Sequence, residues 1–108
     1  MIFTVKFIET SIFTKQSEKF LPDISYRMLQ SFLMLNPEAG AIIKGSGGLR
    51  KVRWNLPGEG KRSALRVIYY FVQPETIYMV FLYKKNQQED LTPEQIRILK
   101  KTVEENLL

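Results

Sequence analysis

Two neighbouring apolar stretches constrain the fold of this 108-residue chain more than any other feature. "RVIYYFV" (66–72) and "TIYMVFLY" (76–83) are separated only by the short, proline-bearing sequence "QPE". A connection this short joins antiparallel strands into a hairpin. Because both stretches are almost continuously apolar, we expect central strands that are covered on both faces. The sequence therefore predicts a sheet with helices packed against it.

The segments around this hairpin predict the rest of an α+β domain. "IFTVKFI" (2–8) and "GLRKVRW" (48–54) alternate as half-buried strands do. "SIFTKQSEKF" (11–20) predicts a short helix capped by Thr10 or Ser11, and "PDISYRMLQSFLMLN" (22–36) predicts a second helix. We expect one domain, residues 1–108, with a small antiparallel (mixed-edge) four-stranded sheet, two N-terminal helices and a C-terminal helix.

Helical spacing also predicts which helix residues form the core. Thr92, Pro93 and Gln95 mark the start of the last helix, with Thr92 and Gln95 in a capping box. The second helix carries an apolar stripe that we expect to be buried: Ile24, Met28, Leu29, Phe32, Leu33 and Leu35. The last helix carries a comparable stripe that should dock on the sheet: Ile96, Leu99, Val103 and Leu107.

Composition excludes several classes of site. The chain has no cysteine, so it can form neither a disulfide nor a thiolate metal site. It also has no histidine, and zinc sites rarely rely on carboxylates alone. We therefore expect no metal and no cofactor. No apolar run reaches the roughly 20 residues of a membrane span, and residues 1–10 lack the features of a signal peptide. We expect a cytoplasmic protein with no membrane partner.

The positive charge of the chain is concentrated in one segment. Residues 44–66 carry seven cations and one carboxylate, Glu59, whereas the other residues sum to −1 within a net charge of +5. A solvated surface usually mixes both signs of charge. Local positive potential of this kind is typical of proteins that bind nucleic acid.

Lys51 and Arg53 lie on the same face of the predicted strand 48–54, where like charges repel each other. Arg66 begins the next strand, and antiparallel pairing would bring it to the same end of the sheet. No acidic run in the sequence is placed to neutralise these cations; the helix dipole is a sufficient explanation for Glu89 and Asp90. We therefore expect a phosphate to lie across this strand face.

Three sequence segments carry a resemblance to a known family. "GLRKVR", then "GKR…RVIYYF", then "YKKNQQEDLTPEQ" resemble the RelE-type toxins of bacterial toxin–antitoxin operons, in particular their HigB-like branch. The resemblance implies a RelE-like microbial ribonuclease fold and a ribosome-dependent endoribonuclease that cleaves mRNA in the A site and inhibits translation. It also implies a cognate antitoxin, which we expect to be a HigA-like helix-turn-helix protein encoded beside this gene.

The resemblance assigns catalytic positions to Lys51, Arg53, Arg66 and Lys85, with Lys84 as an alternative to Lys85. The prototype carries a tyrosine near its C-terminal helix, and the matching position here is Leu91. Tyr70 and Tyr83 are substitutes, although core packing is the first expectation for both. From the cluster of charges and aromatic rings we expect a second set of residues to bind RNA: Arg50, Lys61, Arg62, Lys84, Tyr70 and Tyr83.

Cleavage must then proceed without histidine. Lys51 is the expected base, because neighbouring arginines disfavour its ammonium form. Arg53 and Arg66 would hold the phosphate, and Arg66 could assist the leaving group. Glu59 is a second candidate base, although its glycine-flanked position also suits a turn. Two other functions stay open: a ParE-like inhibitor of DNA gyrase without nuclease activity, and a non-enzymatic RNA-binding module.

Overall fold

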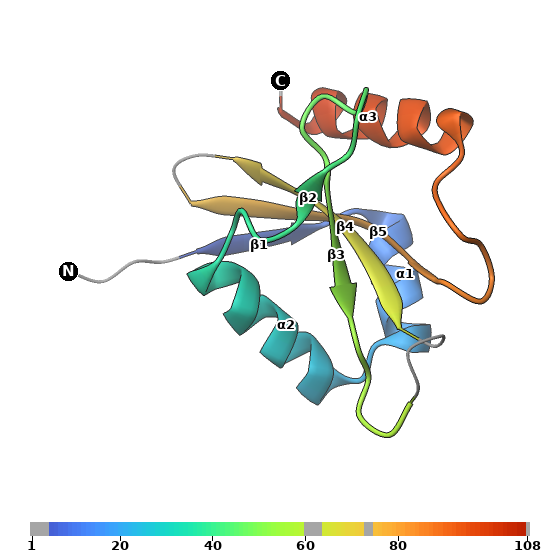
Figure 1. Ribbon diagram of the computed structural model, residues 1–108. Helices are drawn as coiled ribbons and strands as arrows, with labels where there is room; N and C mark the ends of the chain where they lie inside the picture. The colour runs from blue at the N-terminus through green and yellow to red at the C-terminus, as the bar shows by residue number, and fades with distance from the viewer. Residues whose placement is uncertain (1–4, 60–63, 73–74, 108) are drawn as a thin grey trace.

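The computed structural model describes residues 5–59, 64–72 and 75–107, excluding the side chain of residue 107. Three helices and five strands follow one another along these residues (Figure 1). In chain order they are β1 (Lys6–Glu9), α1 (Ser11–Phe20), α2 (Asp23–Leu35), β2 (Ala41–Ile42), β3 (Arg50–Trp54), β4 (Leu65–Val72), β5 (Thr76–Lys84) and α3 (Pro93–Leu107).

All five strands form one mixed sheet in the order β1-β5-β4-β3-β2. β1 pairs in parallel with β5, and the other neighbours are antiparallel. The apolar hairpin strands β4 and β5 lie inside the sheet, as the sequence predicts. The α+β class is confirmed, but the sheet has five strands instead of four. The additional strand, β2, has two residues, both exposed, so it leaves no alternating pattern in the sequence.

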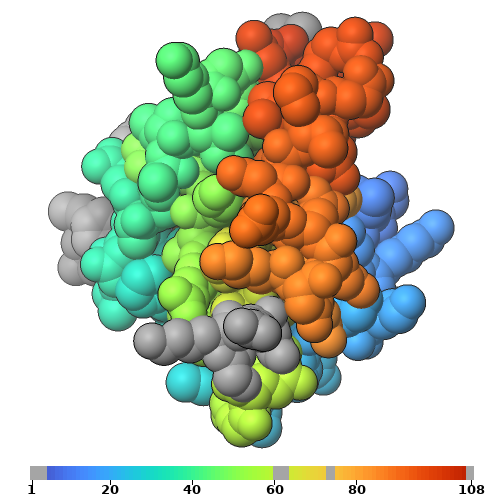
Figure 2. Space-filling view, turned by 45° about the vertical axis from the view of Figure 1, so that its right-hand side comes forward, coloured from blue at the N-terminus to red at the C-terminus, as the bar shows by residue number. Residues whose placement is uncertain are grey.

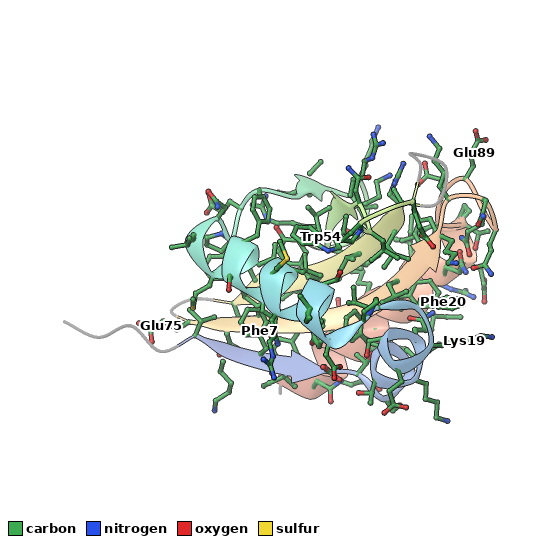
Figure 3. The ribbon with its side chains drawn as sticks, turned by 90° about the horizontal axis from the view of Figure 1, so that it is seen from below. Phe7, Lys19, Phe20, Trp54, Glu75 and Glu89 are labelled. Carbon is green, nitrogen blue, oxygen red and sulfur yellow. The ribbon has the colours of Figure 1, made fainter. Side chains whose placement is uncertain are left out.

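Helices α1 and α2 cover one face of the sheet, which we call the α1/α2 face. Figure 3, the view from below, shows both helices on the near side of the strands. Their core joins Phe13 of α1 and Leu29 of α2 to the strands through Val67, Tyr69 and other buried side chains. Thr10 caps α1, since its side chain accepts a hydrogen bond from the Phe13 N–H. The choice between Thr10 and Ser11 is thereby settled.

The predicted burial of the α2 stripe is partly wrong. Leu29 and Leu33 are fully buried, whereas Ile24 is 74% exposed, Met28 55% and Leu35 78%. Apolar residues occupy more than one side of α2, so their spacing shows that the segment is helical but not which side meets the sheet. Phe32 also lies at the surface, although its ring contacts that of Trp54 at 6.0 Å between centroids.

Helix α3 covers part of the opposite face, which we call the α3 face. Leu99 and Val103 are buried there against the strands, as the apolar stripe predicts; Ile96 packs at the margin. The capping box is confirmed, because the Gln95 N–H donates to Thr92 Oγ1 at 3.1 Å and the Thr92 N–H donates to Gln95 Oε1 at 2.9 Å. This cap fixes where the segment after β5 becomes helical.

A β-bulge in β5 changes which side chains reach the α3 face. Ile68 pairs with Phe81 but Tyr69 pairs with Met79, so Val80 is an extra residue in β5. The Val80 carbonyl accepts a 2.7 Å hydrogen bond from Thr10 Oγ1 instead. An extra residue reverses the alternation of every side chain beyond it. Tyr83, and not Lys84, therefore faces the same side as Arg66.

Candidate nucleic-acid interface

Three neighbouring strands bring Arg53, Arg66 and Tyr83 into one row across the α3 face. Arg53 is directly opposite Arg66 in the β3–β4 register, and Arg66 is directly opposite Tyr83 in the β4–β5 register. The sequence prediction that Arg53 and Arg66 meet is confirmed. Two like charges at opposed positions are unfavourable without a counter-charge. We call this row, together with Lys51, the basic end of the sheet.

Lys51 lies two residues before Arg53 on β3, and its ammonium has a carboxylate partner. Lys51 Nζ donates to Asp90 Oδ1 at 3.1 Å. The expectation that Glu89 and Asp90 serve only the helix dipole is therefore wrong for Asp90. The partners are 39 residues apart, and the segment after β5 brings them together, a contact that no local pattern encodes.

The Lys51–Asp90 ion pair is exposed to solvent on its acidic side. The Asp90 side chain is 72% exposed and the Lys51 side chain 32% exposed. The hydrogen bond from Lys51 lowers the pKa of Asp90, and the backbone N–H of Leu91 and the charge of Arg66 lower it further. Exposed pairs of this kind contribute about 0–1 kcal/mol. A ligand with two acceptor oxygens could therefore replace Asp90 at small cost.

The segment that carries Asp90 lies against the end of the sheet. Figure 2 shows it in orange beside the yellow-green residues of β3. Leu91 is buried in the α3-side core, and the side chain of Gln88 donates to the Asp90 carbonyl and to Gln95 Oε1. Leu91 thus anchors this segment by packing.

Arg66 and Tyr83, which are directly opposite each other in the sheet, each have a buried polar atom. Arg66 is half-buried and Tyr83 is 4% exposed. Arg66 Nη1 and the Tyr83 hydroxyl are both buried with no hydrogen-bond partner among the described residues. Burial raises the pKa of Tyr83, the negative charge of Asp90 raises it further, and Arg66 lowers it in part. Tyr83 is therefore a neutral hydrogen-bond donor at physiological pH.

The structure separates two predicted RNA-binding residues from the basic end. The Lys84 side chain lies on the α1/α2 face, where its Nζ is 5.1 Å from the centre of the Phe20 ring. The β-bulge explains this position. Arg50 also faces away, because its Nη1 donates to the carbonyls of Glu38 and Gly40 and holds the chain that leads into β2.

The remaining predicted site residues differ in how close they lie to the basic end. Lys85 is exposed and its N–H donates to the Ala64 carbonyl, so it leaves β5 at the basic end. Tyr70 is half-buried opposite Tyr78, four residues along β4 from Arg66, and packs with the α3-side core. Glu59 is exposed. Lys61 and Arg62 lie outside the described residues.

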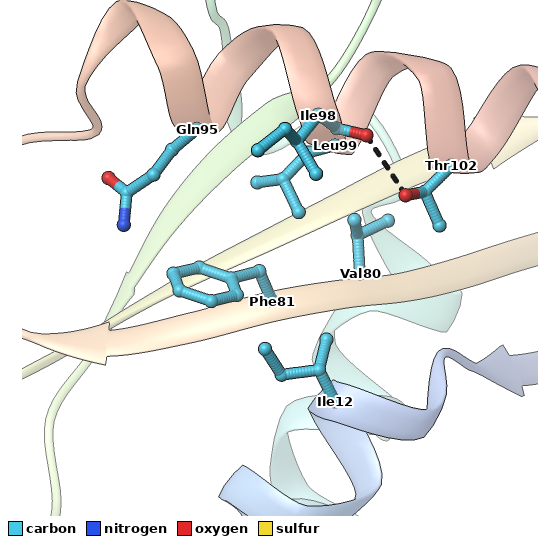
Figure 4. Close-up of a pocket in the computed structure, with 7 residues that line it drawn as sticks. All are labelled: Ile12, Val80, Phe81, Gln95, Ile98, Leu99 and Thr102. Atoms are coloured by element: carbon cyan, nitrogen blue, oxygen red, sulfur yellow. Dashed lines mark hydrogen bonds between the residues drawn. The ribbon is translucent and has the colours of Figure 1, made fainter.

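The described residues offer no metal centre, since no group of three or more Asp or Glu side chains is placed to hold an ion. None of the helices in this part of the chain has the length and hydrophobicity of a membrane span. A hollow of about 270 Å³ lies between α1 and α3 above β5 (Figure 4). Apolar side chains dominate its lining, with Gln95 and Thr102 as the polar residues. None of the residues that line it is a cation.

These observations define a small α+β protein with a cluster of cationic side chains at one end of a mixed sheet. Residues 36–107, two thirds of the chain, match the family described as the RelE toxin of the RelE/RelB toxin–antitoxin system. The chain therefore belongs to the RelE toxin family. As a toxin of a toxin–antitoxin system, it has an antitoxin as its expected partner.

A solved structure supports the fold. The chain is similar to the E. coli toxin RelE, determined as a double arginine-to-alanine mutant in the free state, with a TM-score of 0.55 and 16% sequence identity. The match covers 81% of this chain and 90% of that chain. The extent of this match confirms the predicted RelE-like fold.

Proposed function

We propose that this protein is a ribosome-dependent endoribonuclease of the HigB-like branch, which cleaves mRNA in the A site and thereby inhibits translation. We further propose that residues 1–108 form one toxin domain that acts in the cytoplasm without a metal ion or cofactor. RelE-family toxins are typically endoribonucleases, which supports the proposal. The observation that carries it is the direct opposition of Arg53 and Arg66 beside Lys51.

The basic end has the groups that cleavage by a neighbouring 2′-hydroxyl requires. The 2′-oxygen attacks phosphorus, the bond to the 5′-oxygen breaks, and the products are a 2′,3′-cyclic phosphate and a 5′-hydroxyl. Arg53 and Arg66 project from adjacent strands and can bind the non-bridging oxygens, where negative charge develops in the transition state.

The proton transfers are assigned to the remaining cations of the basic end. In this proposal the incoming RNA phosphate first replaces Asp90 on the Lys51 ammonium; Lys51 then loses its own proton to solvent and accepts the proton of the 2′-hydroxyl. Lys85 leaves β5 at the same end of the sheet and supplies the proton for the 5′-oxygen. The chain has no histidine that could perform either step.

The proposed antitoxin is a HigA-like helix-turn-helix protein. A basic protein of net charge +5 is complemented by an acidic segment. Such a segment could cover the basic end directly or bind the exposed apolar side of α2. Co-expression with the product of the neighbouring gene should restore growth, and the two proteins should co-purify.

Primer extension on a translated mRNA, with purified protein and ribosomes, tests the proposed activity. We expect cleavage at A-site codons by the wild type and by the Lys15→Ala variant, which loses an exposed cation of α1. We expect none by Arg53→Ala or Arg66→Ala. Wild-type binding to mRNA without cleavage would identify an RNA-binding module instead, and inhibition of DNA supercoiling would identify a ParE-like toxin.

A further inference from the structure

Two adjacent buried groups at the basic end lack the hydrogen bonds that buried groups normally make. The described residues contain three buried side-chain atoms of this kind: Trp54 Nε1, Arg66 Nη1 and the Tyr83 hydroxyl. Trp54 points to the α1/α2 face, whereas Arg66 and Tyr83 are directly paired on the α3 face. Unpaired buried donors are rare because each forfeits its hydration. A pair of them, side by side, indicates a ligand.

The segment that carries Asp90 packs against Tyr83. Tyr83 packs in the same buried cluster as Leu91, the residue that follows Asp90. The Asp90 carboxylate accepts from Lys51, which lies two residues from Arg53 on β3, and Arg53 is directly opposite Arg66. The charge of Asp90 also raises the pKa of Tyr83. The only ion pair of Asp90 among the described residues is the exposed contact with Lys51. Among the described residues, this ion pair is the polar contact that ties the segment, which we call the cover, to β3.

The chemistry of the two groups identifies the class of ligand. A guanidinium N–H and a neutral phenol O–H are both donors, so they require an anion with at least two acceptor oxygens. Asp90 already presents a carboxylate oxygen, Oδ1, to Lys51, in the way that a phosphate would. A phosphodiester that displaced this carboxylate would release the cover and could accept hydrogen bonds from the Arg66 guanidinium and the Tyr83 hydroxyl.

We propose that Arg66 and the Tyr83 hydroxyl form a covered phosphate subsite, which opens when an RNA phosphate replaces Asp90 on Lys51. The inference rests on the proposed ribonuclease function and adds Tyr83 as a catalytic residue. The Tyr83 hydroxyl donates a hydrogen bond to a non-bridging oxygen and keeps its proton. Asp90 competes with substrate for Lys51 and so sets the affinity for RNA.

Tyr83→Phe tests the subsite, because it removes only the hydroxyl. Without an unpaired buried donor, the free protein should be at least as resistant to heat as the wild type. Single-turnover cleavage of A-site mRNA should nevertheless slow by about tenfold or more. Tyr78→Phe, a matched change on the same strand outside the basic end, should leave the rate unchanged. Full activity of Tyr83→Phe would overturn the inference.

Asp90→Asn tests the opening step. It should bind a 2′-O-methyl RNA oligonucleotide, which cannot be cleaved, several-fold more tightly than Glu89→Gln. Glu89 projects into solvent (Figure 3), so its change removes the same charge without the contact to Lys51. Equal affinity of the two variants would contradict the proposed competition. This binding test needs no cleavage, so it separates failure of the subsite from failure of the ribonuclease proposal.

Discussion

The α3 face of the sheet has two parts that use the same strands in opposite ways. Beneath α3, Ile68 and Val80 are buried against Leu99. Two residues earlier on β4, the same face carries Arg66, which lies between Arg53 and Tyr83. The change occurs at the N-terminal end of α3, next to the preceding segment that carries Asp90.

This difference shows how a small domain separates stability from function. Burial of apolar side chains beneath α3 favours folding. At the basic end, the two facing arginines and the unpaired buried donors disfavour folding. An anionic ligand would remove this free-energy cost. Substitutions beneath α3 should therefore lower stability, whereas substitutions at the basic end should lower activity and leave stability equal or higher.

The largest expected effect on stability comes from a substitution in the apolar core beneath α3. Leu99→Ala removes a 6%-exposed side chain and should lower the free energy of unfolding by about 2–5 kcal/mol, because it loses apolar contacts and leaves a cavity. Ile98→Ala, at the preceding position and 52% exposed, should lower the free energy of unfolding by less than about 1 kcal/mol. Urea denaturation measures both. Equal losses would show that α3 is not packed as described.

The reverse signature is expected at the basic end. Arg53→Ala should reduce the single-turnover rate of mRNA cleavage by about 10²–10³-fold, since it removes one donor to the charge of the transition state. Its urea midpoint should stay equal or rise, because Arg53 is exposed and faces another arginine. A less stable but fully active variant would contradict the division between the two parts.

A smaller effect should appear in the salt dependence of RNA binding. Several phosphate contacts, each contributing about 0.7–0.9, predict a log–log slope of roughly −3 to −5. Lys51→Ala should make the slope shallower by about one contact. Fluorescence anisotropy across a salt series provides the measurement. A flat response would point to a protein surface as the main partner.

The smallest effect concerns alkaline pH. Because the pKa of Tyr83 is raised in the folded protein, folding favours the protonated phenol. Its contribution is complete below the ordinary value of 10 and is lost as the pH rises through the folded pKa. Denaturation of the wild type and of Tyr83→Phe between pH 9 and about 11 should therefore show a gentler decline in the variant. Identical slopes would contradict the burial of the hydroxyl.

Local signals in the sequence predicted much of the fold correctly. The capping box at Thr92 fixed the start of α3, and the apolar hairpin identified the interior strands. Alternation in "GLRKVRW" placed Lys51 and Arg53 on one face of β3. Each of these features depends on neighbouring residues, so periodicity and capping rules could detect it.

The features that escaped prediction depend on contacts between distant residues. The bulge at Val80 is stabilised by Thr10, 70 residues away, and it alone decides that Tyr83 replaces Lys84 on the α3 face. The ion pair of Lys51 with Asp90 likewise needs the path of the segment after β5. On α2, the exposed Ile24 and the buried Leu29 have equally apolar side chains, and only packing distinguishes them.

The most direct test of the account is an NMR titration of the isotope-labelled protein with a 2′-O-methyl RNA oligonucleotide. We expect the largest amide shifts along β3, at the start of β4 and in residues 83–91. The α2 helix and the hollow between α1 and α3 should change little. Shifts that instead centre on α2 or on that hollow, with the basic end unaffected, would contradict the assignment of the RNA phosphate to Lys51, Arg53 and Arg66.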